Sequence, residues 1–198
     1  MGAYENQKAK DSTITYVAGR SVMMTVTTAR DVVNPSDGIT SLREALSMAD
    51  RLASSGYTDI SIITDNNYHI HVDSTLGPLS INVPLTIDGY SMTINSENSS
   101  CGFVVDTNGK VTLNNLIITK GVGVYGGGLK LSGGELVLNN CLIYECEAVI
   151  QGGAVYAEAG TTLELRNTTV AKNVSATGSG VYGADGSTIK LYNSILAK

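Results

Sequence analysis

Two histidines separated by one residue are the first candidates for chemistry in this 198-residue chain. His69 and His71 lie in the run YHIHV, and alternate residues of a β-strand point to the same side. Two imidazoles on one side, with Asp73 as a third ligand, would suit a metal ion such as zinc. The same pattern fits a strand whose Ile70 and Val72 turn inward and whose histidines are ordinary surface residues. His69 and His71 are therefore the candidate metal ligands, and no motif indicates a resident cofactor.

Converging carboxylates would be a second kind of chemistry. Polysaccharide lyases and glycosidases need two or three of them, to hold Ca²⁺ or to act as acid and base. Asp88, Asp106 and Asp185 fall at different positions of the repeat described below, and no Asp-Asp or Asp-x-Asp pair occurs. The sequence therefore predicts no catalytic residues and favours a non-catalytic protein. A carbohydrate-active β-helix enzyme, either a polysaccharide lyase or a glycoside hydrolase, stays open as the alternative.

Tyrosines are the third group of candidates, this time for binding. Tyr156 and Tyr182 are 26 residues apart, and we expect them to stack outward on successive turns, with Tyr125 elsewhere on the surface. Exposed aromatic rings stack against sugar rings, although tyrosine is also common on strands for propensity alone. Tyr125, Tyr156 and Tyr182 are the candidate ligand-binding residues.

The elements that must position these residues repeat with a period near 26. One strand position recurs every 26 residues, at Phe103, Leu129, Val155 and Val181. A column of asparagines recurs between two further strands, at Asn115, Asn140, Asn167 and Asn193. Three short strands per repeat describe one coil of a parallel β-helix, in which stacking places equivalent residues in ladders. We predict an all-β fold, a right-handed single-stranded parallel β-helix of about five coils, with the asparagines forming an inward, structural ladder.

An N-terminal helix is predicted to cap the first coil. Ser41 and Glu44 form a capping box, in which each side chain bonds to the backbone N–H of the other residue. An apolar stripe at helical spacing follows, at Leu42, Ala45, Leu46, Ala49 and Leu52. Arg43 is assigned, with Ser41 and Glu44, a structural role in closing this lid. Two strands, 13–17 and 22–28, precede the helix.

Three parts follow from these patterns. We predict a tail and first strand at 1–20, a strand and capping helix at 21–58, and the β-helix at 59–198. The last coil stops partway, so we expect further coils beyond it or a partner that covers it.

A family resemblance rests on two groups of residues. Residues 27–46 (TTARDVVNPSDGITSLREAL) resemble the CSLREA-type N-terminal module of large bacterial and archaeal surface proteins, with Thr40 at the cysteine position. Residues 140–156, 167–173 and 178–182 resemble repeats of polymorphic outer-membrane proteins and adhesin-like proteins. The resemblance implies a secreted parallel β-helix, the fold that pectate lyases share, in a protein displayed at the cell surface. It implies no particular enzyme.

The charge, the cysteines and the apolar content of the chain disfavour several classes of binding partner. A net charge of −5 and a pI near 4.9 disfavour nucleic acid and anionic membranes. Three cysteines without C-x-x-C spacing argue against a disulfide framework or a zinc site, and for buried free thiols. No apolar run is long enough to insert into a membrane. We expect an extracellular segment that contacts a glycan or a cell-surface protein, and that self-associates through an open C-terminal coil.

Overall fold

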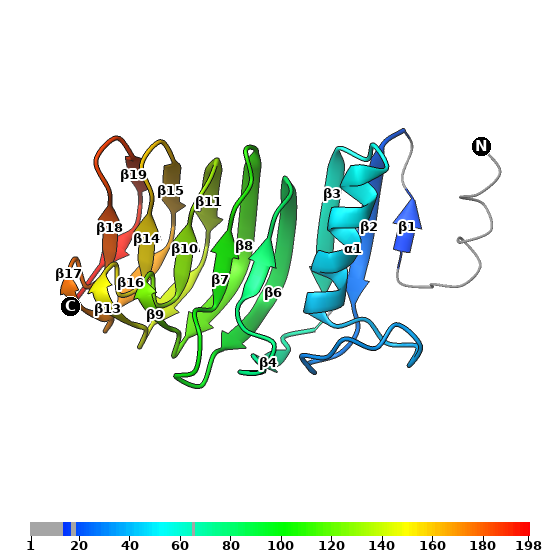
Figure 1. The fold of residues 1–198 in the computed structure, drawn as a ribbon, viewed down its shortest axis with the longest axis horizontal. Coiled ribbons are helices and arrows are strands. Elements are labelled where there is room, and N and C mark those ends of the chain that lie inside the picture. Colours follow the sequence, from blue (N-terminus) through cyan, green and yellow to red (C-terminus); the bar gives the residue numbers. More distant parts are fainter. Residues whose placement is uncertain (1–13, 17–18, 65) are drawn as a thin grey trace.

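The computed structural model describes residues 14–16, 19–64 and 66–198, which form a right-handed parallel β-helix of about five turns (Figure 1). Its turns are stacked along the long axis, with the helix near the N-terminal end and the last strands at the other. Strand pairing follows the repeat, since Leu129 lies between Phe103 and Val155, and Val155 pairs in turn with Val181. The predicted fold class and the 26-residue spacing are confirmed.

Three walls enclose the interior. The first wall contains β1 (Ile14–Tyr16), β2 (Ser21–Val26), β3 (Asp59–Thr64), β6 (Leu85–Asn95), β8 (Lys110–Thr119), β11 (Glu135–Asn139), β15 (Thr162–Arg166) and β19 (Thr188–Tyr192). Strands β6 and β8 continue past a corner into the second wall, with β4 (His69–His71), β12 (Leu142–Tyr144), β16 (Thr169–Ala171) and β20 (Ile195–Leu196). The third wall is β5 (Leu79–Ile81), β7 (Phe103–Val105), β10 (Leu129–Leu131), β14 (Val155–Ala157) and β18 (Val181–Gly183).

A fourth strand in three of the turns corrects the expectation of three strands per repeat. Strands β9 (Val122–Tyr125), β13 (Glu147–Gln151) and β17 (Val174–Thr177) form a separate sheet, here called the side sheet. Glycines between β9 and β10 bring the backbone close to the next turn, since a Cβ at Gly127 would lie 2.3 Å from the Glu147 carbonyl oxygen. Val124 and Val149 are 56% and 65% exposed. With apolar side chains facing solvent, these strands lack the pattern by which a strand is recognised.

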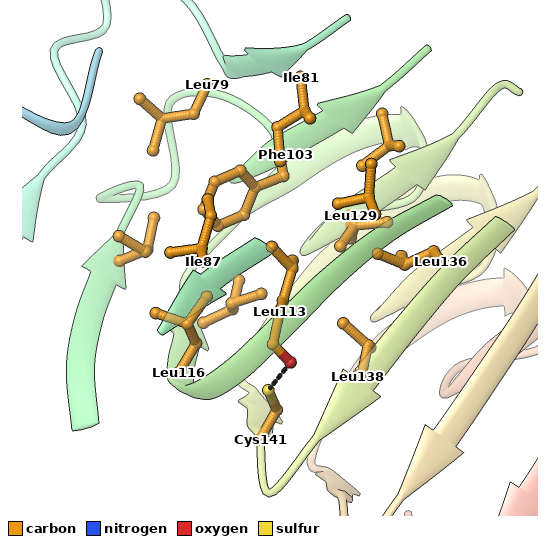
Figure 2. Packing of buried hydrophobic residues seen from close by; sticks show 14 of the residues in the cluster. Leu79, Ile81, Ile87, Phe103, Leu113, Leu116, Leu129, Leu136, Leu138 and Cys141 are labelled. Atoms are coloured by element: carbon orange, nitrogen blue, oxygen red, sulfur yellow. Dashed lines mark hydrogen bonds between the residues drawn. The ribbon is translucent and has the colours of Figure 1, made fainter. Parts of the chain in front are cut away.

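The core consists of inward side chains from the three walls, stacked level upon level. Figure 2 shows Phe103, Leu113, Leu129, Leu136 and Leu138 packed together, and all five are fully buried. Burial of this kind contributes about 1.5–3 kcal/mol for each large apolar side chain. At the last turn the same columns are open, so Ile189 and Leu191 are 38% and 47% exposed.

The cap helix is confirmed, and the structure adds how it closes the stack. Helix α1 (Leu42–Ser54) buries the five predicted residues, Leu42, Ala45, Leu46, Ala49 and Leu52. It packs against β2, β3 and β5, and β5 is the edge strand of the third wall. The helix therefore covers that edge, while the first wall continues past it through β3, β2 and the antiparallel β1. Within the described chain, no helix is long and apolar enough to cross a membrane.

Candidate functional site

The cap is attached to the first turn through one arginine. Nε and Nη2 of Arg43 donate to the two carboxylate oxygens of Asp31, both at 2.8 Å. The same guanidinium donates to the carbonyl oxygens of Leu76, Gly77 and Pro78, at 3.3, 2.7 and 3.1 Å. The Arg43 and Asp31 side chains are only 13% and 2% exposed. Arg43 is thus fully engaged in structure, as its assigned role requires.

The capping box is present and holds the approach to the helix as well as its first turn. The Ser41 hydroxyl accepts from the Glu44 backbone N–H at 3.1 Å, and Glu44 Oε2 accepts from the Ser41 backbone N–H at 2.9 Å. Glu44 Oε1 also accepts from the Asn34 backbone N–H at 2.5 Å. Ser41 in turn donates to the Val32 carbonyl oxygen at 2.7 Å. These contacts leave neither residue placed for chemistry on a ligand.

The first members of the asparagine column form a ladder, but on the outside, so the predicted inward direction is wrong. Nδ2 of Asn140 donates to Oδ1 of Asn115 at 2.7 Å, and Nδ2 of Asn115 donates to Oδ1 of Asp88 at 2.8 Å. Asn140, Asn167 and Asn193 are exposed. All four residues of the column have positive φ, between 48° and 56°. Asparagine suits this left-handed conformation, and the corner it makes turns the following residue inward instead.

Among the residues that the structure describes, the buried asparagine is Asn173, which the repeat pattern does not reveal. Its side chain donates to the carbonyl oxygens of Ile143 and Ala171, at 3.0 and 2.9 Å, and accepts from the Cys146 backbone N–H at 2.9 Å. It is 3% exposed. Cys146 occupies the equivalent corner one turn earlier, so the sequence offers no repeated asparagine there to mark the position.

The cysteines are structural. Cys101, Cys141 and Cys146 are all free thiols. Burial raises the pKa of Cys141 to about 11 and that of Cys146 to about 12. Because the thiolate is the reactive form, these groups are unsuited to act as nucleophiles near neutral pH. The prediction of buried thiols is confirmed for Cys141 and Cys146, which are 3% and 1% exposed.

The tyrosines form one continuous stack. The rings of Tyr156 and Tyr182 lie 5.8 Å apart between centroids and 4° from parallel. Tyr125 is not elsewhere on the surface, because its ring lies 4.9 Å from that of Tyr156, tilted by 42°. Tyr156 therefore has an aromatic neighbour from the preceding turn and another from the following turn. Its ring faces are largely occupied by other rings, which leaves edges and hydroxyls for a ligand.

The two histidines lie outward on β4, as the alternation of Ile70 and Val72 required. Nδ1 of His71 is 2.5 Å from Oε1 of Glu97. The Asp73 carboxylate instead accepts from the backbone N–H and the hydroxyl of Thr75, at 2.8 and 2.7 Å, and these bonds lower its pKa. Within the described ranges, no three His, Cys, Asp or Glu side chains are grouped to hold a metal ion. Metal binding at His69 and His71 stays a prediction.

Two open hollows lie in the early turns. One, of about 370 Å³, is lined by Asp31, His71, Val72, Asp73, Ser74, Glu97 and Ser99. The other, of about 630 Å³, is lined by Asn67, Tyr90, Ser91 and Asn115. Tyr90 is not among the residues predicted from the sequence. Its signal was the break in the repeat at Gly89, where later turns have asparagine.

Comparison of the chain with protein-family models, with curated proteins and with solved structures gave no match. The fold itself defines the class of the protein, which is a capped parallel β-solenoid.

Proposed function

We propose that this chain is a non-catalytic segment of a larger microbial surface protein, a rigid rod whose outer faces contact a glycan or another cell-surface protein. The observation that carries the proposal is the unbroken stack of turns, in which outward columns are held at fixed spacing over a continuous buried core. Such a stack resists bending because every turn is hydrogen-bonded to its neighbours. Length and fixed spacing are what a presenting or spacing segment needs.

Outward side chains suited to contact support the second half of the proposal. The side sheet exposes Val124, Val149, Ile150 and Val174 by 56%, 65%, 39% and 59%. The tyrosine stack borders this sheet, since Tyr125 is the last residue of β9. Exposed apolar and aromatic groups that cluster are a common feature of protein and glycan contacts.

The extracellular setting is part of the proposal and rests on the residues that resemble the CSLREA-type module and the adhesin-like repeats. The Arg43–Asp31 attachment and the Ser41–Glu44 box give that N-terminal stretch a physical task, which is to seat the cap on the first turn. A stretch with this task belongs at the beginning of a β-helix of any length.

One experiment separates the proposal from a carbohydrate-active enzyme. The chain is incubated with insoluble and soluble polysaccharides, including pectate, and two quantities are followed: retention of the protein on the polysaccharide, and release of reducing ends or of unsaturated products. We expect retention on at least one polysaccharide without products, with or without added Ca²⁺. The Tyr156→Ala and Tyr182→Ala variants then show whether the stack contributes to retention.

Sustained product release would overturn the non-catalytic proposal and favour the lyase or hydrolase. If the chain binds no glycan, the glycan half of the proposal fails, and contact with a protein through the side sheet remains. That form is tested by Val149→Asp, which should abolish capture of a cell-surface protein partner. Capture that Val149→Asp leaves unchanged would remove the side sheet from the proposal.

A further inference from the structure

The second turn carries a bulge at the corner between the first and second walls, where the later turns have a single asparagine. Along β6 and β8, Asp88 pairs with Asn114 and Met92 pairs with Leu116. Three residues, 89–91, therefore lie opposite the single residue Asn115. Bulges of this kind re-aim a side chain and are over-represented beside functional sites. The side chain that this one turns outward is Tyr90.

The bulge is held in an unfavourable backbone conformation. Tyr90 and Ser91 have φ of 46° and 66°, a region in which bulky residues are rare. The corresponding corner of each later turn uses asparagine, which tolerates it. The preceding residue, Gly89, has no room for a side chain, because a Cβ there would lie 2.1 Å from Cδ2 of Leu116. Strain kept in this way points to a function for the residue that bears it.

Tyr90 is also the most exposed of the tyrosines named above. It is 65% exposed, whereas Tyr125 is 37% exposed. Within the described ranges Tyr90 belongs to no ring pair, in contrast to Tyr156, which has two aromatic neighbours. The ring faces of Tyr90 are thus open to a ligand, while those of the tyrosine stack are largely occupied.

Polar groups surround this ring at the hollow of about 630 Å³ that it lines with Asn67, Ser91 and Asn115. All four lining residues are uncharged. Asn115 is kept in orientation by its bonds to Asp88 and Asn140, at 2.8 and 2.7 Å. An open aromatic face with amides and a hydroxyl beside it can stack on a sugar ring and bond to its hydroxyls.

We propose that the hollow formed by Asn67, Tyr90, Ser91 and Asn115 is a binding subsite for a neutral saccharide. The proposal deepens the glycan contact proposed above and rests on it. Anionic sugars are disfavoured, because no Lys or Arg lines the hollow and the Asp88 carboxylate lies next to Asn115. A neutral hexose presents hydroxyls for the amides and an apolar ring face for Tyr90.

The test uses calorimetric titration of the whole chain with cellohexaose, mannohexaose and hexagalacturonate. We expect binding of at least one neutral hexaose and none of the hexagalacturonate. Tyr90→Ala should weaken that binding by about tenfold or more, a factor typical of removing one aromatic side chain from a site. Tyr192→Ala, which removes a tyrosine that is 49% exposed on β19 in the last turn, serves as the matched control and should leave it within about twofold.

Thermal unfolding of Tyr90→Asn separates binding from a merely structural role. Asparagine suits a positive φ better than tyrosine, so this variant should unfold at a higher temperature while losing saccharide binding. A lower unfolding temperature with binding retained would show that Tyr90 is there for packing, and would overturn the subsite.

Two further outcomes distinguish this inference from the broader proposal. Neutral-hexaose binding that survives Tyr90→Ala and is abolished in Tyr182→Ala would overturn the subsite and keep the glycan contact, at the stack. Binding of hexagalacturonate alone would overturn the neutral class. If no hexaose binds, both the subsite and the glycan form of the proposed function fail, and contact with a protein remains.

Discussion

The early and the late turns of this β-helix are held together in different ways. From β7 onward, each level repeats the contacts of the one before, as in the column of Leu113, Leu138 and Leu165, all fully buried. In the early turns the decisive contacts occur once. One nearly buried ion pair adds to the apolar contacts of the cap. The second turn has a bulge at the corner that the later turns make with a single asparagine.

This difference affects how far the loss of one side chain changes the stability of the fold. Where equivalent residues stack, each level is bordered by levels packed in the same way, so truncating one side chain leaves similar packing above and below it. An interaction that occurs once has no such substitute. Several residues at the two hollows, including Asp31, His71 and Tyr90, belong to no column of the repeat, so the early turns offer surfaces that the later turns do not repeat.

Asp31→Ala should have the largest effect on stability. It would leave the Arg43 guanidinium, 13% exposed, without its anionic partner, and would remove the acceptor of the Asp73 backbone N–H, bonded at 2.8 Å. Breaking a buried pair in this way costs on the order of 3–5 kcal/mol. Chemical denaturation measures the loss.

Glu158→Ala is the matched control for Asp31→Ala. Its pair with Lys130 spans 2.9 Å, but the two side chains are 38% and 33% exposed, and a surface pair contributes about 0–1 kcal/mol. Equal losses in the two variants would contradict the distinction between a single cap contact and a replaceable surface one.

Leu138→Ala and Leu191→Ala test the repeated part within a single column. Leu138 is fully buried and Leu191 is 47% exposed, although both occupy the same position of the repeat. Removing the buried side chain should cost about 2–5 kcal/mol through reduced burial and a residual cavity. The exposed one should cost under about 1 kcal/mol. A comparable loss at Leu191, measured by denaturation at low protein concentration, would mean that the last turn is covered in solution.

Much of the fold could be predicted because the stacking of turns in a β-helix requires similar residues to recur at a fixed spacing. Equivalent residues must stack, so Phe103, Leu129, Val155 and Val181 recur at one spacing, and the Ser41–Glu44 box marks where the helix begins. The side sheet was missed for a physical reason. Its strands expose Val124, Val149 and Val174 to solvent, which removes the inward alternation that identifies a strand.

Candidate sites were harder to predict than the fold. The period finds Tyr156 and Tyr182, but ring stacking between turns cannot be read from spacing alone, and it is this stacking that occupies their faces. Tyr90 belongs to no column. Its exposure depends on a two-residue insertion and on the contact between Gly89 and Leu116, and both are properties of the folded chain.

The smallest expected loss of stability comes from the asparagines, and it compares the buried Asn173 with the exposed Asn140. Asn173→Ala would leave the Cys146 backbone N–H and the Ile143 carbonyl oxygen without the partners they have at 2.9 and 3.0 Å. A buried polar group left unpaired costs about 1–3 kcal/mol. Asn140→Gly removes an amide of the outer ladder but keeps a residue suited to its φ of 53°, so denaturation should show a loss of about 0.5 kcal/mol or less. A larger loss at Asn140 would mean that the outer ladder, rather than the inner corner, aligns the turns.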